Sequence, residues 1–207
     1  MLTVWGRRNS SNVRKVIWCL EELQVPYRSI DAGGAFGVVN EPDYRALNPN
    51  GRVPTLKDGE LVLWESNAIV RYLCAHYAAG TPWFPADAAE RASADKWMDW
   101  CTSSLAGPFK PLFWGLLRTP AEQRNQAEIQ TALAQCAEQL SLVDQTLARQ
   151  PWLSGQYLGM GDIPLGAFAY AWFGLPIERP SLPHLHAWYE RLQSREAYRK
   201  GVMTVLD

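Results

Sequence analysis

Apolar and polar positions in the first part of the chain change period several times, which predicts short strands separated by helices. Residues 2–5 indicate one strand and residues 25–30 a second, while residues 52–66 indicate two strands joined by a tight turn at Asp58-Gly59. A helix is expected over 66–77, and an earlier one is indicated by apolar residues at helical spacing, namely Val13, Val16, Ile17, Leu20 and Leu23. The predicted order is βαβ followed by ββα.

The remainder of the chain shows helical patterns only. Residues 78–87 contain one glycine and two prolines and lack periodicity, so they are expected to connect two units. Beyond them, the longest apolar stripe follows steps of three and four residues through Ile129, Leu133, Cys136, Leu140, Val143 and Leu147. We therefore expect an α/β unit over residues 1–80 and an all-helical unit over residues 88–207.

Composition narrows the function mainly by exclusion. The 207 residues carry a formal net charge of −1, so no bulk charge attracts nucleic acid or anionic lipid. No stretch approaches the ~20 apolar residues of a membrane span, and no signal-peptide pattern is present. The four cysteines form neither a CxxC pair nor a zinc-type spacing, so we expect reduced core thiols and no metal. A cytoplasmic protein without nucleic-acid or membrane partners is predicted.

The sequence RVPTL places a proline at the start of a strand. Because proline cannot donate to a ladder, Pro54 is expected on an edge strand or at the first strand residue. X-Pro bonds are the usual place for a cis peptide, and a cis bond would expose the backbone of Val53. An exposed strand backbone can bind an extended peptide. The alternative is an ordinary trans proline in a surface loop.

A second candidate site lies in the sequence WESNAI, where the last strand gives way to a helix. Ser66 is expected to cap this helix, whose free N–H groups can hold a carboxylate. Glu65 beside it offers a charge for an ammonium group. Together they suit the head group of an α-amino acid, although a plain capped helix explains the same residues.

The third candidate is the polar turn GRRNSSNVRK after the first strand. Ser10, Ser11 and Asn12 precede a helix expected to begin near Val13, where side-chain donors and the helix dipole can stabilise a thiolate. Capping needs only one of these residues, so three in succession favour a functional turn over the capping alternative.

With these motifs together, the whole chain resembles a cytosolic glutathione S-transferase of the bacterial, serine-type, theta-like group. The stretches NPNGRVPTL and WESNAIVRYL carry the resemblance, supported by the domain order. It implies a thioredoxin-like N-terminal domain, a cis-Pro54 and an all-helical C-terminal domain. It also implies glutathione as co-substrate, with Val53 contacting its cysteinyl part, Glu65 and Ser66 holding its γ-glutamyl end, and Arg52 reaching a carboxylate or a neighbouring backbone group.

Alignment of the polar turn with serine-type members implies Ser10 as the residue that activates the thiol. Asn12 and Ser11 stay as alternatives, the latter if the turn is one residue longer. The resemblance places a small hydrophobic electrophile between the domains, near Arg7 and Arg8 and against apolar side chains that could equally be core, namely Leu105, Phe109, Phe113 and Trp114. One departure from the family pattern is GMGD, where Gly159 replaces a capping Ser or Thr and Asp162 is retained.

The resemblance implies a detoxifying transferase that attacks an electrophilic carbon with the glutathione thiolate. Glutathione-dependent disulfide reduction is the main enzymatic alternative, and isomerisation or dehalogenation is a weaker one. A non-catalytic binding module is the alternative of another class, disfavoured by the complete set of ligand residues. The resemblance also implies a homodimer, with which a tryptophan-rich face around Trp97 and Trp100 is compatible.

Overall fold

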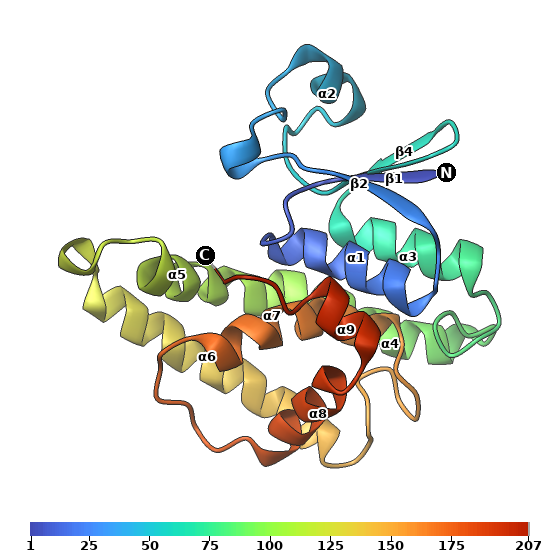
Figure 1. Cartoon of the computed structure of the whole chain (residues 1–207). Helices are drawn as coiled ribbons and strands as arrows, with labels where there is room; N and C mark the ends of the chain where they lie inside the picture. Colours follow the sequence, from blue (N-terminus) through green and yellow to red (C-terminus); the bar gives the residue numbers. More distant parts are fainter. Residues whose placement is uncertain (207) are drawn as a thin grey trace.

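The computed structural model describes residues 1–206 and confirms a thioredoxin-like N-terminal domain followed by a helical domain (Figure 1). The N-terminal elements are β1 (Leu2–Trp5), α1 (Ser11–Glu22), β2 (Tyr27–Ile30), the short helix η1 (Gly34–Phe36), α2 (Pro42–Leu47), β3 (Thr55–Asp58), β4 (Leu61–Trp64) and α3 (Ser66–Tyr77). Helix α1 begins at Ser11, ahead of the expected start near Val13, because the extended Ser10 already occupies the N-cap position.

The four strands form one mixed sheet in the order β2-β1-β3-β4. β1 pairs in parallel with β2 and antiparallel with β3, while β3 and β4 form the hairpin predicted at Asp58-Gly59. Gly59 has a φ of 58°, a conformation that glycine adopts at little steric cost. β3 is therefore an interior strand, and Pro54 lies just before its first residue rather than on a sheet edge.

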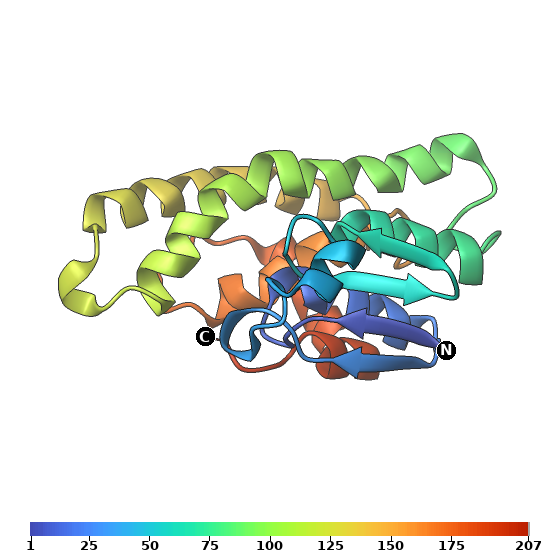
Figure 2. The same ribbon diagram turned by 90° about the horizontal axis from the view of Figure 1, so that it is seen from above.

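The second half of the described chain contains α4 (Ala88–Trp100), the π-helical turn η2 (Cys101–Leu105), α5 (Ala106–Leu117), η3 (Ala121–Gln123), α6 (Gln126–Leu147), η4 (Met160–Asp162), α7 (Ile163–Gly174), α8 (Pro183–Gln193) and α9 (Glu196–Gly201). Asp87 caps α4 by accepting hydrogen bonds from the N–H groups of Ala89 and Glu90. Helices α5 and α6 pack side by side (Figure 2). Within residues 1–206, no helix is long and apolar enough to cross a membrane.

Helix α1 lies between the two domains, with α3 on one side and α7 and α9 on the other (Figure 1). The apolar spacing predicted one buried face, yet every residue from Val13 to Leu20 is buried, including Arg14 and Lys15. At Gly201 a Cβ atom would lie 2.5 Å from the Cα of Trp18, so glycine allows the backbones of α1 and α9 to meet. The start of α1 is thus fixed by both domains.

The GMGD stretch forms η4 and leads into α7, as expected from the retained Asp162. This buried carboxylate accepts hydrogen bonds from four donors, the N–H groups of Leu153, Ser154 and Gly159 and the indole of Trp188. Burial nevertheless raises the pKa of the Asp162 carboxyl, while the donors act in the opposite direction. A Cβ at Gly159 would lie 2.8 Å from the carbonyl oxygen of Pro82. The residue at the cap position is therefore glycine because the connecting segment approaches it closely.

The hydroxyl that Gly159 lacks is supplied by another residue. Ser154 Oγ accepts a hydrogen bond of 3.1 Å from the N–H of Gly161, the second residue of η4. This is the bond that a serine at the cap position would make.

The tryptophans of α4 are not an exposed face. Trp97 is 7% exposed, and its ring packs edge-on against Trp100 with 5.3 Å between the ring centroids. Trp97 therefore belongs to the core, whereas Trp100 is half-buried at its edge.

Candidate functional site

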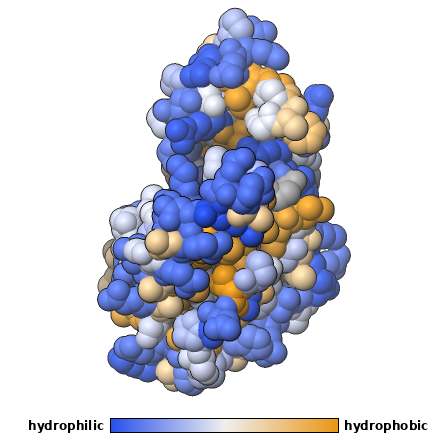
Figure 3. Space-filling view, turned by 90° about the vertical axis from the view of Figure 1, so that its left-hand side faces the viewer, coloured by the Kyte–Doolittle hydropathy of each residue, from blue (hydrophilic) through white to orange (hydrophobic). Residues whose placement is uncertain are grey.

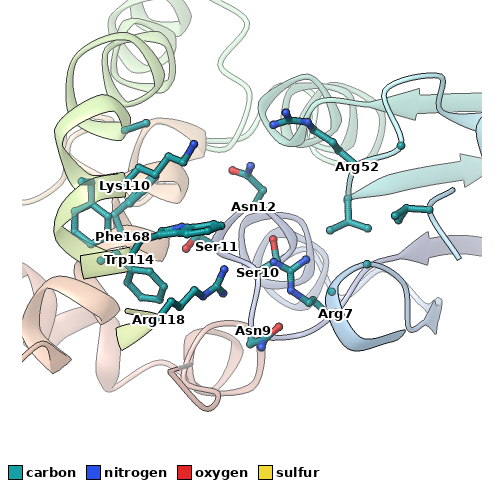
Figure 4. A pocket seen from close by; sticks show the side chains of 18 residues that line it. Arg7, Asn9, Ser10, Ser11, Asn12, Arg52, Lys110, Trp114, Arg118 and Phe168 are labelled. Carbon is teal, nitrogen blue, oxygen red and sulfur yellow. The ribbon is translucent and has the colours of Figure 1, made fainter. Parts of the chain in front are cut away.

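A cleft of about 410 Å³ opens where the start of α1 faces helix α5 (Figure 4). Its lining residues come from the polar turn, the loop at η1, the segment before β3, and helices α5 and α7: Arg7, Asn9, Ser10, Ser11, Asn12, Gly33, Gly34, Val39, Gly51, Arg52, Val53, Ala106, Phe109, Lys110, Phe113, Trp114, Arg118 and Phe168. In Figure 3, apolar surface emerges among hydrophilic surface on one face of the molecule. The cleft combines both kinds of surface.

The polar turn places all three predicted catalytic candidates in this cleft. Ser10 has extended backbone angles, and its carbonyl accepts the first helical hydrogen bond, 2.9 Å from Arg14 N. Its hydroxyl makes no capping bond to the helix, unlike most serines at this position. Ser11 is the first helical residue and half-buried, whereas Asn12 is exposed. The Ser10 hydroxyl is thus not committed to holding the helix together.

The Val53-Pro54 peptide bond is cis, as predicted. Two buried side chains hold the backbone next to it. Tyr44 donates to the carbonyl of Arg52 at 2.6 Å, and Asn48 donates to the same oxygen at 2.9 Å. Because pairing with β1 ends at Thr55, the preceding backbone of Val53 lies outside the ladder and borders the cleft. The Val53 backbone is therefore outside the sheet ladder just before the start of β3.

At the start of α3, Glu65 occupies the N-cap position that was expected for Ser66. Glu65 is the N-cap residue, with a φ of 72° that is uncommon for a residue other than glycine, and Ser66 is the first helical residue. Ser66 therefore does not cap the helix. Its hydroxyl donates to Oδ1 of Asn12 at 3.2 Å, which links it to the cleft although it does not line the cleft itself. Glu65 is exposed. Backbone strain of this kind occurs frequently at ligand sites.

Lys15 lies beneath Ser66 and was not identified from the sequence. Its side chain is buried, and Nζ donates to Ser66 Oγ at 3.5 Å and to Asn67 Oδ1 at 3.4 Å. Within the described residues it forms no ion pair. Burial lowers the pKa of Lys15, while Cys101 and Glu65 act in the opposite direction. In the sequence, Lys15 falls within a helical pattern in which a lysine is ordinarily expected to face solvent, so the pattern does not indicate its burial.

Helix α5 forms the opposite wall of the cleft. Phe109, Phe113 and Trp114 line it, as expected, and Trp114 is 49% exposed. The Trp114 ring lies between two cations, with Lys110 Nζ 5.7 Å and Arg118 Cζ 5.0 Å from its centroid. Neither cation was singled out from the sequence, although steps of four residues place Lys110, Trp114 and Arg118 on one helix face.

Two residues expected in the electrophile pocket lie elsewhere. Leu105 is 1% exposed and belongs to the core. It lies in the π-helical turn η2, which connects α4 to α5. Arg8 does not line the cleft, because its guanidinium donates to the carbonyl of Lys200 in α9. Its neighbour Arg7 does line the cleft, together with Phe168 of α7, which the sequence pattern did not identify.

The sequence was compared with models of known protein families and with known proteins. Residues 1–75 match the family model of the glutathione S-transferase N-terminal domain, and residues 95–196 match that of the C-terminal domain. The chain is 46% identical over 205 residues to glutathione S-transferase GstB of Escherichia coli strain K12, covering 98% of both proteins. It is 31% identical over 210 residues to glutathione S-transferase 3 of Zea mays, covering 99% of this chain and 94% of the maize protein.

Solved structures agree with the sequence comparison. The fold matches the crystal structure of the theta class glutathione S-transferase from Xanthomonas axonopodis pv. citri with glutathione bound, with a TM-score of 0.96 and 62% identity. That match covers 100% of this chain and 99% of the other. The apo form of the Xanthomonas protein gives a TM-score of 0.88, with 56% identity over 100% of this chain and 98% of that one. The chain belongs to the glutathione S-transferase family.

Proposed function

We propose that the protein binds glutathione in this cleft, stabilises its thiolate at the Ser10 turn and transfers it to an electrophile. The observation that carries the proposal is the Ser10 hydroxyl, which lines the cleft at the start of α1 without serving as a helix cap. The 62% identical Xanthomonas relative, whose structure contains glutathione, supports the choice of ligand.

Glutathione is expected to lie as an extended peptide along the segment just before β3. The Val53 backbone next to the cis bond would pair with the cysteinyl part, as in strand addition. Glu65 and Ser66 would hold the ammonium and carboxylate of the γ-glutamyl end, and Arg52 would reach the other carboxylate. Salt bridges and charge-assisted bonds of this kind fix orientation as well as affinity.

The chemical step needs a thiolate, because the neutral thiol is a poor nucleophile. An unperturbed thiol has a pKa of about 8.5, so only a few per cent is ionised at neutral pH. Ser10 donates a hydrogen bond to the sulfur, and the start of α1 adds its dipole, which together favour the charged form. The thiolate then forms a carbon–sulfur bond with the electrophile as the leaving group departs, and the thiol proton passes to solvent.

Replacement of Ser10 tests this function directly. Ser10→Ala should lower kcat for conjugation about 100-fold or more, by analogy with the loss of one donor to a developing anion. KM for glutathione should change little, because the rest of the peptide is held elsewhere. Ser11→Ala removes the hydroxyl of the next residue of the same turn and should leave kcat near the wild-type value. Loss of turnover in Ser11→Ala instead of Ser10→Ala would assign the role to Ser11. Near-normal turnover in Ser10→Ala together with loss in Asn12→Ala would reassign the role to Asn12.

The main alternative, glutathione-dependent disulfide reduction, uses the same thiolate. It is tested with hydroxyethyl disulfide, whose rapid reduction alongside slow conjugation of a chloronitrobenzene would favour reduction over transfer. In either case the Ser10 turn would stabilise the attacking sulfur.

We further propose a cytoplasmic, detoxifying homodimer whose chain divides into residues 1–80 and 88–207. Support for association comes from the edge strand β4, where Leu61 and Trp64 are each 39% exposed although they are large and apolar. Light scattering coupled to size-exclusion chromatography measures the mass that tests this proposal.

A further inference from the structure

The charges that line the cleft are all of one sign. Arg7, Arg52, Lys110 and Arg118 contribute four cations, and the lining contains no aspartate or glutamate. The whole chain, by contrast, has 20 lysines and arginines against 21 acidic residues. A cleft lined by one sign of charge concentrates ligands of the opposite sign.

The four cations lie on two walls (Figure 4). Arg7 and Arg52 belong to the N-terminal domain, on the side of the proposed glutathione site, where Arg52 is expected to reach a carboxylate of the peptide. Lys110 of α5 and Arg118, the C-cap residue of that helix, lie on the wall that faces the second substrate and project into the cleft beside Trp114. The cations of α5 are therefore placed for the acceptor rather than for the peptide.

The exposed ring of Trp114 indicates the shape of a ligand that fits against this wall. This half-exposed ring has cations at 5.7 Å and 5.0 Å from the centroid. The buried rings of Phe109 and Phe113 stack on each other and line the same cleft. A flat conjugated body can stack on the indole. A negative group on its rim would then meet one of the flanking cations.

We propose that the acceptor is a flat electrophile that carries a carboxylate or sulfonate, with Trp114 holding the ring and Lys110 and Arg118 holding the anion. This inference rests on the proposed transferase function. It replaces the sequence-based expectation of a hydrophobic acceptor, because a purely apolar substrate would make no use of the two cations beside Trp114.

The reaction with a chloroaromatic probe of this class balances without further reactants. The glutathione thiolate adds to the ring carbon that bears chlorine, and the electron pair moves onto the nitro groups. The carbon–chlorine bond then breaks, chloride leaves, and the thioether carries the negative substituent of the acceptor.

The test compares 4-chloro-3,5-dinitrobenzoate with its methyl ester. The two probes share a leaving group and a ring, and each kcat/KM is divided by the rate of the uncatalysed reaction with glutathione, which removes their intrinsic difference in reactivity. We expect the wild type to prefer the acid by about tenfold, and the preference to fall as ionic strength rises.

Lys110→Met should reduce the acid-to-ester preference by about three- to tenfold, and Lys110→Arg should restore most of it. Lys96→Met is the matched control, because Lys96 lies 6.0 Å from the ring of Trp97 on α4 but does not line the cleft. Its preference should equal that of the wild type.

The outcomes separate this inference from the function on which it rests. Conjugation of both probes with no preference for the acid, or a preference unaffected by Lys110→Met, overturns the anionic acceptor and leaves the transferase function intact. Failure to conjugate either probe overturns the transferase function itself.

Discussion

Replacing Lys15 by methionine would remove a cation from beneath the proposed γ-glutamyl site while keeping a side chain of similar shape. Lys15 Nζ donates to Ser66 Oγ, so the Ser66 proton points toward an acceptor. In the described structure that acceptor is Oδ1 of Asn12 at 3.2 Å. In the complex we expect the glutathione carboxylate to take its place, since a charged acceptor makes the stronger bond.

The size of the effect follows from the distances. The Lys15 Nζ to Ser66 Oγ separation is 3.5 Å. A carboxylate that accepts from Ser66 would lie about 3 Å further on, so the two charges would be roughly 6 Å apart. At an effective dielectric constant of about 20, their attraction is about 3 kcal/mol, which is a ceiling because solvent enters the cleft. We therefore expect the Kd for glutathione to rise about 10- to 100-fold.

Stability should change in the opposite direction. Because burial lowers the pKa of Lys15 in the folded state, the unfolded chain binds more protons between that lowered pKa and the ordinary lysine pKa of 10.5. The cost of burying the ammonium is thus fully present below the folded pKa and is relieved as pH rises toward the unfolded one. At pH 7, Lys15→Met should unfold at the same urea concentration as the wild type or higher, and this advantage should shrink at alkaline pH.

Isothermal titration calorimetry measures the Kd, and urea unfolding at pH 7 and pH 9 measures the stability. Lys15→Gln is the matched variant, because an amide keeps a donor for Ser66 but has no charge. If Lys15→Met and Lys15→Gln weaken glutathione equally, the charge rather than the hydrogen bond is responsible. An unchanged Kd in Lys15→Met would refute the reasoning.

Two predictions concern the packing that positions the site. Gly201→Ala would bring a Cβ to 2.5 Å from the Cα of Trp18 and should cost about 1–3 kcal/mol, seen as a lower Tm by circular dichroism. Gly107→Ala, with no atom within 4 Å of the new Cβ, should not lower it. Ser154→Ala removes the acceptor of the Gly161 N–H and should cost about 1 kcal/mol in urea unfolding, so an unchanged midpoint would contradict the capping role.

Local chemistry made much of the fold predictable. The Asp58-Gly59 turn and the helix over 66–77 were placed correctly, because glycine and the apolar spacing specify them within a few residues. Strand order was not predicted, because pairing depends on contacts between distant segments. Of the two places expected for Pro54, the order excludes the sheet edge, and Pro54 lies directly before the first residue of β3, where a missing donor costs no ladder bond.

The part of the site that is formed by short continuous motifs could be predicted from the sequence. The polar turn and Val53 line the cleft, as the motifs indicated. Arg7 and Arg8, by contrast, are neighbours in the sequence with different partners, and contact of Arg8 with α9 selects which of them borders the cleft. The spacing of apolar residues from 105 to 114 could not distinguish the buried Leu105 of η2 from the residues of α5 that line the cleft, because all of them follow a helical period.

The position of the Ser10 turn depends on the helical domain as much as on its own sequence. Arg14, one turn into α1, donates to Thr204 Oγ1 at 2.9 Å and to the carbonyl of Val205 at 2.8 Å. At the other end of α1, Glu22 accepts two hydrogen bonds, at 2.7 Å and 2.6 Å, from the guanidinium of Arg195. Because these contacts hold both ends of the helix, movement of residues 195–205 would shift the Ser10 turn. The second domain therefore supplies the α5 wall of the cleft and also fixes the position of Ser10 on the opposite wall.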